Sequence, residues 1–436
     1  MVPVMYRSLF SLLLNEVLYI TGFFYWSISK NNLHIYKKDK GVFSMLSSIA
    51  FIMLSGMVIS YSCKRTNIPS LVGLIFIGII LGPSVLNLLD PTLLNISADI
   101  RQVVLIIILT RAGLSLDLNE LKKVGRPAIL LSFVPASFEI IGTMIFAPLF
   151  LGMTLIDSAL LGAVLGAVSP AVVVPRMITL ISKKVGTEKG IPQLILAGSS
   201  VDDIYALVMF SSFLSLAQSG EFRLINLLSL PFSILFGVLV GFLSGFLLSL
   251  LFKKTQLDSI IQVLIMLSSS FILVSIEDYF TNFPFSGILA VMSMAIIIYR
   301  QLPEQSEKIS NIYNKLWIPG EIFLFVLVGA SVNIQFAFSA GLMPVLVILL
   351  SLCVRMIGTW GSLIGTNLNT KEKLFSLIAY SPKATVQAAI GGVPLAMGLP
   401  AGELILTMSV LAILITAPVG AFGIDYSYQK LLSPDS

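Results

Sequence analysis

The sequence is poor in charge, cysteine and histidine. Charged residues make up only 11% of its 436 residues and 56% are hydrophobic, whereas soluble proteins carry about 25% charged residues. This shortage excludes a soluble domain and indicates an integral membrane protein. Two cysteines, Cys63 and Cys353, are too far apart in the sequence to suggest a disulfide framework. The single histidine, His34, lies in a polar stretch, which argues against a histidine metal centre or proton relay.

Two signatures of other functions are missing as well. No phosphate-binding Walker loop occurs, so ATP is not the expected energy source. The net charge is +5, but no dense basic run is interleaved with aromatic residues, so we do not expect nucleic-acid binding. We expect neither an enzyme nor a cofactor, and we interpret the excess of Lys and Arg as basic loops on the cytoplasmic side.

Long apolar runs fill the chain. A helix needs about 20 apolar residues to cross a bilayer, and this length predicts an all-α polytopic membrane protein with about fourteen transmembrane helices. The first, at about 8–28, either spans or lies in the interface; we favour a spanning helix within an extra N-terminal segment at 1–42. The others fall near 43–62, 69–89, 101–116, 127–151, 155–181, 191–217, 226–252, 258–277, 284–300, 317–333, 338–364, 372–397 and 401–423.

Basic residues predict the orientation of these spans. Lys and Arg gather in loops on one side, which is therefore predicted to be cytoplasmic together with the tail at 426–436. They are Lys64, Arg65, Lys122, Lys123, Arg126, Lys183, Lys184, Lys189, Lys253, Lys254, Lys308, Lys315, Lys371 and Lys373. The loop with Lys30, Lys37, Lys38 and Lys40 disagrees with this rule if the first segment spans. We expect a multi-pass plasma-membrane protein with both termini in the cytoplasm.

The chain repeats itself at an offset of about 215 residues. Matching markers open, close or interrupt spans in both copies: Asn67-Ile-Pro69 with Asn282-Phe-Pro284, Leu116-Asp117 with Val332-Asn333, and Ser169-Pro170 with Ser381-Pro382. With five spans in each copy and two spans between them, the copies run through the membrane in opposite directions. Inverted repeats with paired broken helices are typical of secondary transporters whose site lies at the bilayer midplane.

Two spans are interrupted by prolines. The first reads Gly166-Ala-Val-Ser-Pro-Ala-Val-Val-Val-Pro175, and the second contains Tyr380-Ser-Pro-Lys-Ala-Thr-Val-Gln-Ala-Ala-Ile-Gly-Gly-Val-Pro394. Proline removes a backbone donor and disfavours helix in the residue before it. Unwound backbone is tolerated at membrane depth only inside protein or beside water. We therefore expect the two breaks to cross, with Lys383 neutralising the helix C-termini that meet there.

Two adjacent carboxylates, Asp202 and Asp203, lie near the middle of the apolar run 191–217. Each costs about 2.5–3.5 kcal/mol at the centre of a membrane helix, so they indicate a site for a cation and a proton. Adjacent helical residues point about 100° apart, so one aspartate faces the ion cavity and the other a neighbouring helix. Ser199 and Ser200 share the face of Asp203 and can ligate Na⁺ or Li⁺, and we include Ser169 of the first break in this predicted ion site.

Glu139 and Arg355 are each the lone charge of a span and lie 216 residues apart, in matching positions of the two repeats. We predict a buried ion pair between them with a structural role. Arg355 cannot give up a proton at accessible pH, so it is not itself a proton carrier. Arg111 and Asp117, at the end of another span, are expected to line an entrance.

Several motifs occur in the order seen in a known family: Leu165-Gly-Ala-Val-Ser-Pro-Ala-Val-Val-Val-Pro175, Glu188-Lys-Gly-Ile-Pro192, Ala197-Gly-Ser-Ser-Val-Asp-Asp-Ile204 and Pro382-Lys-Ala-Thr-Val-Gln-Ala-Ala-Ile-Gly391. They resemble the NHA-type branch of the monovalent cation:proton antiporters over about 60–425. The resemblance implies exchange of Na⁺ or Li⁺ for H⁺ by an elevator-like mechanism. It also implies that Asp203 is the main ion-binding carboxylate, with Asp202 beside it.

The resemblance further implies how the antiporter unit, at 43–425, is divided. It implies a homodimer with a mobile core domain at about 101–217 and 317–397, and a dimerisation domain at about 43–100, 226–300 and 401–425. Many bacterial relatives with paired aspartates carry lysine where Arg355 stands, so their electrogenic exchange of two protons is not carried over. Asp202 is left without a fixed lysine partner, because Arg355 is expected to pair with Glu139.

Alternative functions differ in the polar groups that they require. A K⁺/H⁺ antiporter needs the same aspartates, because the pair alone does not fix the ion radius. A sodium-coupled solute symporter can share the inverted repeats, but it needs a larger polar cavity and separate sodium sites. A channel needs a continuous polar pore lining, and the spans show none. We therefore favour an antiporter whose partners are membrane lipids, monovalent cations and a second copy of the chain.

Overall fold

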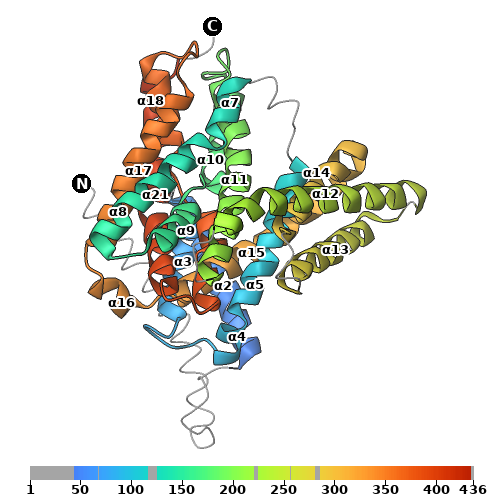
Figure 1. The fold of residues 1–436 in the computed structure, drawn as a ribbon, viewed down its shortest axis with the longest axis horizontal. Helices are drawn as coiled ribbons and strands as arrows, with labels where there is room; N and C mark the ends of the chain where they lie inside the picture. The colour runs from blue at the N-terminus through green and yellow to red at the C-terminus, as the bar shows by residue number, and fades with distance from the viewer. Residues whose placement is uncertain are drawn as a thin grey trace, which may run out of the picture.

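The computed structural model describes residues 44–66, 68–115, 125–219, 224–255, 257–279 and 285–433, and every regular element in these residues is a helix (Figure 1). Within this part, nine helices are long and apolar enough to cross a membrane, and three shorter apolar helices accompany them. The all-α polytopic membrane fold is therefore confirmed. The expected span at 8–28 and the segment 1–42 lie outside the described residues.

Each later expected span corresponds to one helix or to a chain of shorter helices. The unbroken ones are α2 (Met45–Arg65), α3 (Ser70–Leu81), α5 (Ser97–Ser115), α8 (Val134–Leu151), α11 (Ile191–Ser219), α12 (Leu224–Thr255), α13 (Ser259–Tyr279), α14 (Gly287–Gln301), α15 (Pro303–Ala330), α17 (Met343–Ser362) and α21 (Gly402–Leu431). The broken ones are α9 (Leu155–Leu165) with α10 (Pro170–Ser182), and α18 (Thr370–Ala379) with α19 (Thr385–Ile390) and α20 (Val393–Ala396). Three short helices complete the described chain: α7 (Arg126–Leu131), which precedes α8 within the span expected at 127–151, α4 (Pro91–Asn95) and α16 (Ile334–Ser339).

One boundary differs clearly from the expectation. Helix α15 begins at Pro303, well before the expected start at 317, and it carries Lys308 and Lys315 on its first half. A hydropathy criterion ends a span where charges appear, whereas the backbone continues to form helix because proline is well suited to the first helical turn. These two lysines therefore lie on a helix rather than in a loop.

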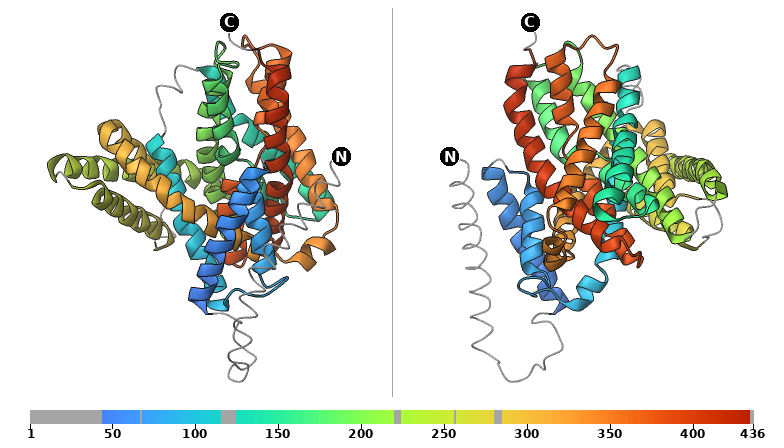
Figure 2. Two further views of the ribbon diagram at one scale, coloured as in Figure 1. Left: turned by 180° about the vertical axis from the view of Figure 1, so that it is seen from behind. Right: turned by 60° about the vertical axis from the view of Figure 1, so that its left-hand side comes forward.

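The helices pack into two units. The scaffold unit contains α2, α3, α5, α12, α13, α14 and α15, and the crossing unit contains α7 to α11 and α17 to α21. In the scaffold unit α15 packs on both α3 and α5, while α14 packs on α12 and α5. Figures 1 and 2 show α12 and α13 extending to one side, away from the crossing unit.

This grouping differs from the expected domain boundaries. Helices α5 and α15 pack with the scaffold unit, although their residues fall in the expected core domain at 101–217 and 317–397. Helix α21 packs on α18, α20, α10 and α17, although 401–425 was assigned to the dimerisation domain. Thr416 of α21 accepts a hydrogen bond from the backbone N–H of Lys383 at 2.9 Å. We therefore propose that the moving body corresponds to the crossing unit as defined by these contacts.

The packing follows the inverted repeat. Helix α3 opens the first copy and packs on α15, the second helix of the other copy, while α14 opens the second copy and packs on α5. Helix α8 likewise packs on its counterpart α17. This mutual exchange is what a pseudo-twofold axis requires. Several of the sequence markers, including Leu116-Asp117 and Asn282-Phe-Pro284, lie outside the described residues.

Glycines bring α3 and α15 together. A Cβ atom added at Gly78 would meet the backbone of Val326, and one added at Gly329 would meet the backbone of Ile75. Small residues let helix backbones approach closely within a membrane, where the hydrophobic effect no longer holds helices together. These contacts explain why two helices that are distant in sequence form the centre of the scaffold unit.

The crossing unit gathers basic residues at one end. Lys189 Nζ lies 2.9 Å from a carboxylate oxygen of Glu372 near the start of α18. The backbone N–H of Gly186, between α10 and α11, donates to the carbonyl of Ser433 at 3.1 Å. The α10–α11 turn, the start of α18 and the end of α21 therefore lie together, at the end where Figure 1 places the C-terminus.

Candidate ion site at the helix crossing

The two broken helices meet at their breaks. Helix α9 ends at Leu165 and α10 begins at Pro170, while α18 ends at Ala379 and α19 begins at Thr385. The N–H of Ser169 donates to the carbonyl of Pro382 at 2.8 Å, which joins one break directly to the other. The expected crossing of two broken helices is therefore present, and all its unwound backbone lies inside the crossing unit.

Lys383 lies at the centre of this crossing and is fully buried. Its ammonium group donates to the carbonyl of Leu165, the last residue of α9, at 2.5 Å. This is the contact with a helix C-terminus that the sequence predicted, and it places positive charge where the helix dipole is negative. Lys383 Nζ also lies 2.7 Å from Glu139 Oε2. That second partner was not foreseen.

Arg355 joins four elements of the crossing unit. Its guanidinium lies 3.0 Å from Glu139 Oε2, as predicted, and Nε donates to the carbonyl of Tyr380 at 3.0 Å. It also donates to the carbonyl of Gly166 in the first break. Both Arg355 and Glu139 are completely buried. The guanidinium thus holds α8 and both breaks in place around α17.

One expectation about the aspartates was wrong. Arg355 was expected to pair with Glu139 and so to leave Asp202 without a fixed lysine partner, but Arg355 Nη2 also lies 3.0 Å from Asp202 Oδ2. The same oxygen accepts the N–H of Val168 at 2.8 Å. A planar guanidinium presents several donors in a fixed fork, so Arg355 can serve Glu139 and Asp202 at once. The matching positions in the two repeats predicted Glu139 as a partner of Arg355, but they gave no indication that Arg355 also pairs with Asp202.

The two aspartates therefore have different surroundings. Asp202 is completely buried, and its Oδ2 is held by Arg355 and Val168. Asp203 is also buried, with 7% of its surface accessible to solvent. Its Oδ1 is buried without a hydrogen-bond partner among the described residues. A buried carboxylate oxygen without a donor is energetically costly. Asp202 Oδ1 is unpaired as well, so the difference between the two aspartates is that Arg355 and Val168 hold Asp202 in place, whereas Asp203 has no salt bridge among the described residues.

The three serines of the predicted ion site are not equivalent. Ser199 is buried and its hydroxyl donates to the carbonyl of Leu196 at 3.2 Å, which leaves its lone pairs for a cation. Ser169 lies in the first break, and its buried hydroxyl has no hydrogen-bond partner in the described structure. The side chain of Ser200 lies outside the described structure.

Sequence reasoning missed one polar side chain of the crossing. Gln387 of α19 is fully buried, and its amide nitrogen donates to the carbonyl of Ala167 at 2.9 Å. It is an amide in the otherwise apolar stretch that follows Thr385, which is the signal that could have identified it. Through this bond α19 satisfies backbone of the first break that has left the helix.

The charges of the crossing do not cancel. Three carboxylates (Glu139, Asp202 and Asp203) face two basic groups (Arg355 and Lys383), all of them buried, so the ionised cluster carries a net charge of −1. Na⁺ and Li⁺ are hard ions that prefer carboxylate, hydroxyl and carbonyl oxygens, as other hard cations do. The available oxygens of Asp203, Ser169 and Ser199 are of these kinds.

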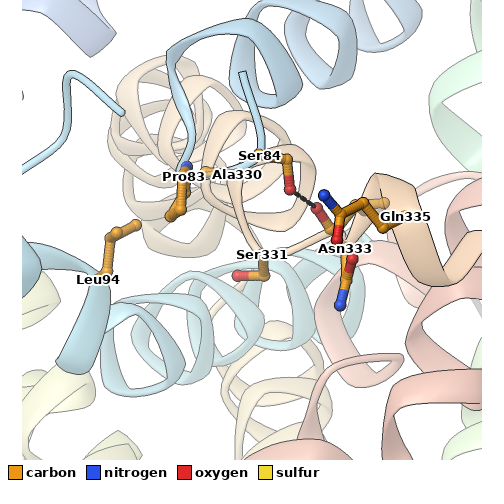
Figure 3. A pocket seen from close by; sticks show the side chains of 8 residues that line it. Pro83, Ser84, Leu94, Ala330, Ser331, Asn333 and Gln335 are labelled. Carbon is orange, nitrogen blue, oxygen red and sulfur yellow. Dashed lines mark hydrogen bonds between the residues drawn. The ribbon is translucent and has the colours of Figure 1, made fainter. Parts of the chain in front are cut away.

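Other polar features lie away from the crossing. Arg111 of α5 lies over Trp317 of α15, with 6.0 Å between the guanidinium carbon and the ring centroid, and its expected companion Asp117 is outside the described residues. A surface pocket of about 450 Å³ lies where α3, α4, α15 and α16 meet (Figure 3). Its lining includes Ser84, whose hydroxyl donates to the carbonyl of Val332 at 2.8 Å, and no residue of the predicted ion site.

Comparison with known proteins identifies the family. Residues 49–425 match the model of the transmembrane sodium/hydrogen exchangers. The chain belongs to the sodium/hydrogen exchanger family. This confirms the family assigned from the motifs. Sodium/hydrogen exchanger 9B2 of Pongo abelii is 34% identical to the present chain over 352 residues, and sodium/hydrogen exchanger 9B1 of Mus musculus is 36% identical to it over 346 residues.

These alignments cover 77% of the present chain but only 64% and 61% of the two mammalian exchangers, so the chain spans less than two thirds of their length. The sodium proton antiporter MjNhaP1 of Methanocaldococcus jannaschii has the same fold. Its structure aligns with a TM-score of 0.77 and 19% identity, over 89% of this chain and 98% of its own.

Proposed function

We propose that this member of the sodium/hydrogen exchanger family exchanges Na⁺ (or Li⁺) for H⁺, with Asp203 as the ion-binding carboxylate and Asp202 beside it. The observation that carries the proposal is the buried five-residue cluster at the helix crossing, whose net charge is −1 and in which Asp203 retains an unpaired oxygen. One Na⁺ or one H⁺ on Asp203 cancels that charge.

Competition between the two ions for one carboxylate is sufficient for exchange. A charged carboxylate is costly to move through an apolar environment. The site therefore crosses when Asp203 carries Na⁺ or H⁺, and it stays in place when Asp203 is empty. Arg355 remains paired with Glu139 and Asp202 throughout, and Lys383 remains paired with Glu139. Each cycle then exchanges one cation for one proton.

The crossing unit moves as one body against the scaffold unit, in the manner of an elevator. In support of this, Arg355 and Lys383 tie α8, α9, α11 and both breaks together, so relative motion among these elements would break buried ion pairs. Breaking a buried pair costs about 3–5 kcal/mol, whereas sliding the two units past each other leaves the pairs intact.

The scaffold unit holds a second copy of the chain in a homodimer at the plasma membrane. Helix α12 supports this arrangement, because it exposes a continuous row of large apolar side chains suited to lipid or to that copy: Leu235, Leu239, Phe242, Leu243, Phe246, Leu247 and Leu250. The end of the crossing unit that gathers Lys183, Lys184 and Lys189 faces the cytoplasm together with the C-terminus, in line with the positive-inside rule.

Purified protein in liposomes with an imposed pH gradient tests this function. Adding Na⁺ or Li⁺ is expected to collapse the gradient, and the Asp203→Asn variant is expected to leave the gradient unchanged. Asp157→Asn makes the same chemical change at an intermediate-exposure position at the start of α9 and should retain wild-type exchange. If Asp203→Asn exchanges at the wild-type rate, the site assignment is wrong. If only K⁺ collapses the gradient, the chain is a K⁺/H⁺ antiporter.

A further inference from the structure

The side chain of Tyr380 is a buried feature of the crossing that the exchange scheme does not use. Tyr380 follows α18 at the start of the second break, and it is completely buried. Its carbonyl accepts a hydrogen bond from Arg355, but its hydroxyl has no hydrogen-bond partner among the described residues. Buried polar groups are almost always paired, so this hydroxyl requires an acceptor at some stage of the transport cycle.

The hydroxyl points at the helix that carries the aspartates. A Cβ atom added at Gly198 of α11 would collide with the Tyr380 hydroxyl and would lie 3.3 Å from the ring carbon that bears it. Only glycine therefore admits the hydroxyl at this point of α11. Residues four apart share one helix face, and four residues after Gly198 comes Asp202. Since each residue advances a helix by about 1.5 Å, Asp202 lies about 6 Å further along the same face.

Two charged residues near Tyr380, Asp202 and Asp203, are candidates for the acceptor of its hydroxyl. The guanidinium carbon of Arg355 of α17 lies 6.0 Å from the centroid of the Tyr380 ring, and Arg355 pairs with Asp202 of α11, which Asp203 follows directly. Arg355 is only a donor, and Asp203 points about 100° away from the face that Gly198 and Asp202 share. Asp202 Oδ1 is buried and unpaired, because Arg355 and Val168 both bind its other oxygen. The unpaired donor therefore faces α11 at Gly198, and the unpaired acceptor belongs to a residue about one helical turn further along the same face.

We propose that the Tyr380 hydroxyl is a positioning donor for Asp202. It donates to Oδ1, directly or through one bridging water, and such a water joins groups at this separation with little loss of strength. With both oxygens satisfied, Asp202 keeps its orientation and does not compete for the ion, so Na⁺ or Li⁺ binds at Asp203. The proposal deepens the proposed function and rests on it. Tyr380 acts through Asp202 and does not itself touch the ion.

Tyr380→Phe tests this role because it removes the hydroxyl and retains the ring. The probe is NaCl or LiCl, added to protein in detergent while the thermal unfolding midpoint is recorded. We expect the variant to unfold near the wild-type temperature without added ion, and to need several-fold more Na⁺ or Li⁺ for half of the ion-induced stabilisation. Tyr313→Phe alters a fully buried tyrosine of α15 in the scaffold unit and should leave that concentration unchanged.

A double-mutant cycle separates the hydroxyl from packing. Gly198→Ala displaces the hydroxyl, so it should weaken ion binding in the wild-type background and have little further effect with Phe at 380. Its contact with Leu131, 3.0 Å from the added Cβ, is the same in both backgrounds and cancels. An unchanged ion requirement in Tyr380→Phe, or an equal effect of Gly198→Ala in both backgrounds, overturns the proposal. The thermal assay measures ion binding in detergent, where no transport takes place. A wild-type protein that binds Na⁺ or Li⁺ in this assay but does not exchange it in liposomes would therefore contradict the proposed function and not the role of Tyr380.

Discussion

Arg355 lies 3.0 Å from Asp202 Oδ2, the oxygen that also accepts the backbone N–H of Val168. The first aspartate of the pair is therefore fixed through this one oxygen to α17 and to the first break, while the second has no salt bridge among the described residues. Under the proposed function, this difference divides the work of the site between two adjacent positions: Asp202 maintains the crossing, and Asp203 exchanges its ligand.

This division predicts opposite phenotypes for the two aspartates. Asp203→Asn should abolish exchange and leave the unfolding temperature close to that of the wild type, because no donor is lost at its Oδ1. Asp202→Asn should lower the free energy of unfolding by about 1.5–3 kcal/mol, the contribution of a hydrogen bond to a charged group. Thermal unfolding in detergent, without added Na⁺, distinguishes them. Equal stability losses in the two variants would contradict the division of roles.

A charge swap between Glu139 and Arg355 should fail to restore stability. Removing either charge alone should cost about 3–5 kcal/mol. The double change Glu139→Arg with Arg355→Glu restores their mutual attraction, but it places the new arginine against Lys383 and the new glutamate against Asp202. The free energy of unfolding of the double variant should therefore be no higher than that of Glu139→Arg alone or of Arg355→Glu alone.

The matched control for this swap is a salt bridge elsewhere in the same unit. Arg176 and Asp425 lie 2.9 Å apart, with 19% and 47% of their side chains exposed. Exposed pairs contribute only about 0–1 kcal/mol, and neither residue has a second salt-bridge partner among the described residues. Reversing this pair should change the unfolding temperature little. Full recovery of stability in the Glu139/Arg355 swap would contradict this prediction, because it would show that Lys383 and Asp202 do not destabilise the reversed pair.

A contact between the two units predicts a variant impaired in motion. Arg101 of α5 packs on Gly392, between α19 and α20, where an added Cβ would lie 2.9 Å from the guanidinium carbon. Gly392→Ala should slow exchange several-fold at saturating Na⁺ and leave the Na⁺ concentration for half-maximal binding unchanged. Gly361→Ala is the control, because no atom lies within 4 Å of its added Cβ. A shifted binding concentration in Gly392→Ala would place its effect at the ion site instead.

The net charge of −1 at the crossing predicts exchange without net charge movement. One Na⁺ or one H⁺ neutralises the cluster, so the loaded site carries no charge in either direction. The rate of Na⁺-driven proton movement in liposomes should therefore be independent of an imposed membrane potential. A rate that rises with potential of one sign would indicate that more than one proton moves in each cycle.

The spans, the breaks and the family were predictable because their signals lie in the order and spacing of residues along the chain. Apolar runs, the prolines Pro170 and Pro382, and the offset between Glu139 and Arg355 can all be read without knowing which helices touch. The remaining partners of Arg355 and Lys383 were not predictable, since hydropathy and spacing do not say toward which neighbour a side chain points. The division into a core and a dimerisation domain came from the family resemblance, and the packing of α5, α15 and α21 groups these helices differently.

The imbalance of three carboxylates and two basic groups also sets a thermodynamic limit. If one cation is exchanged for one proton, the membrane voltage drops out of the driving force, and only the two concentration ratios remain. A tenfold Na⁺ ratio, worth about 1.4 kcal/mol, can then sustain a pH difference of about one unit and no more. Such a protein couples the proton gradient only to the Na⁺ gradient, and it cannot draw on the membrane voltage to exceed that limit.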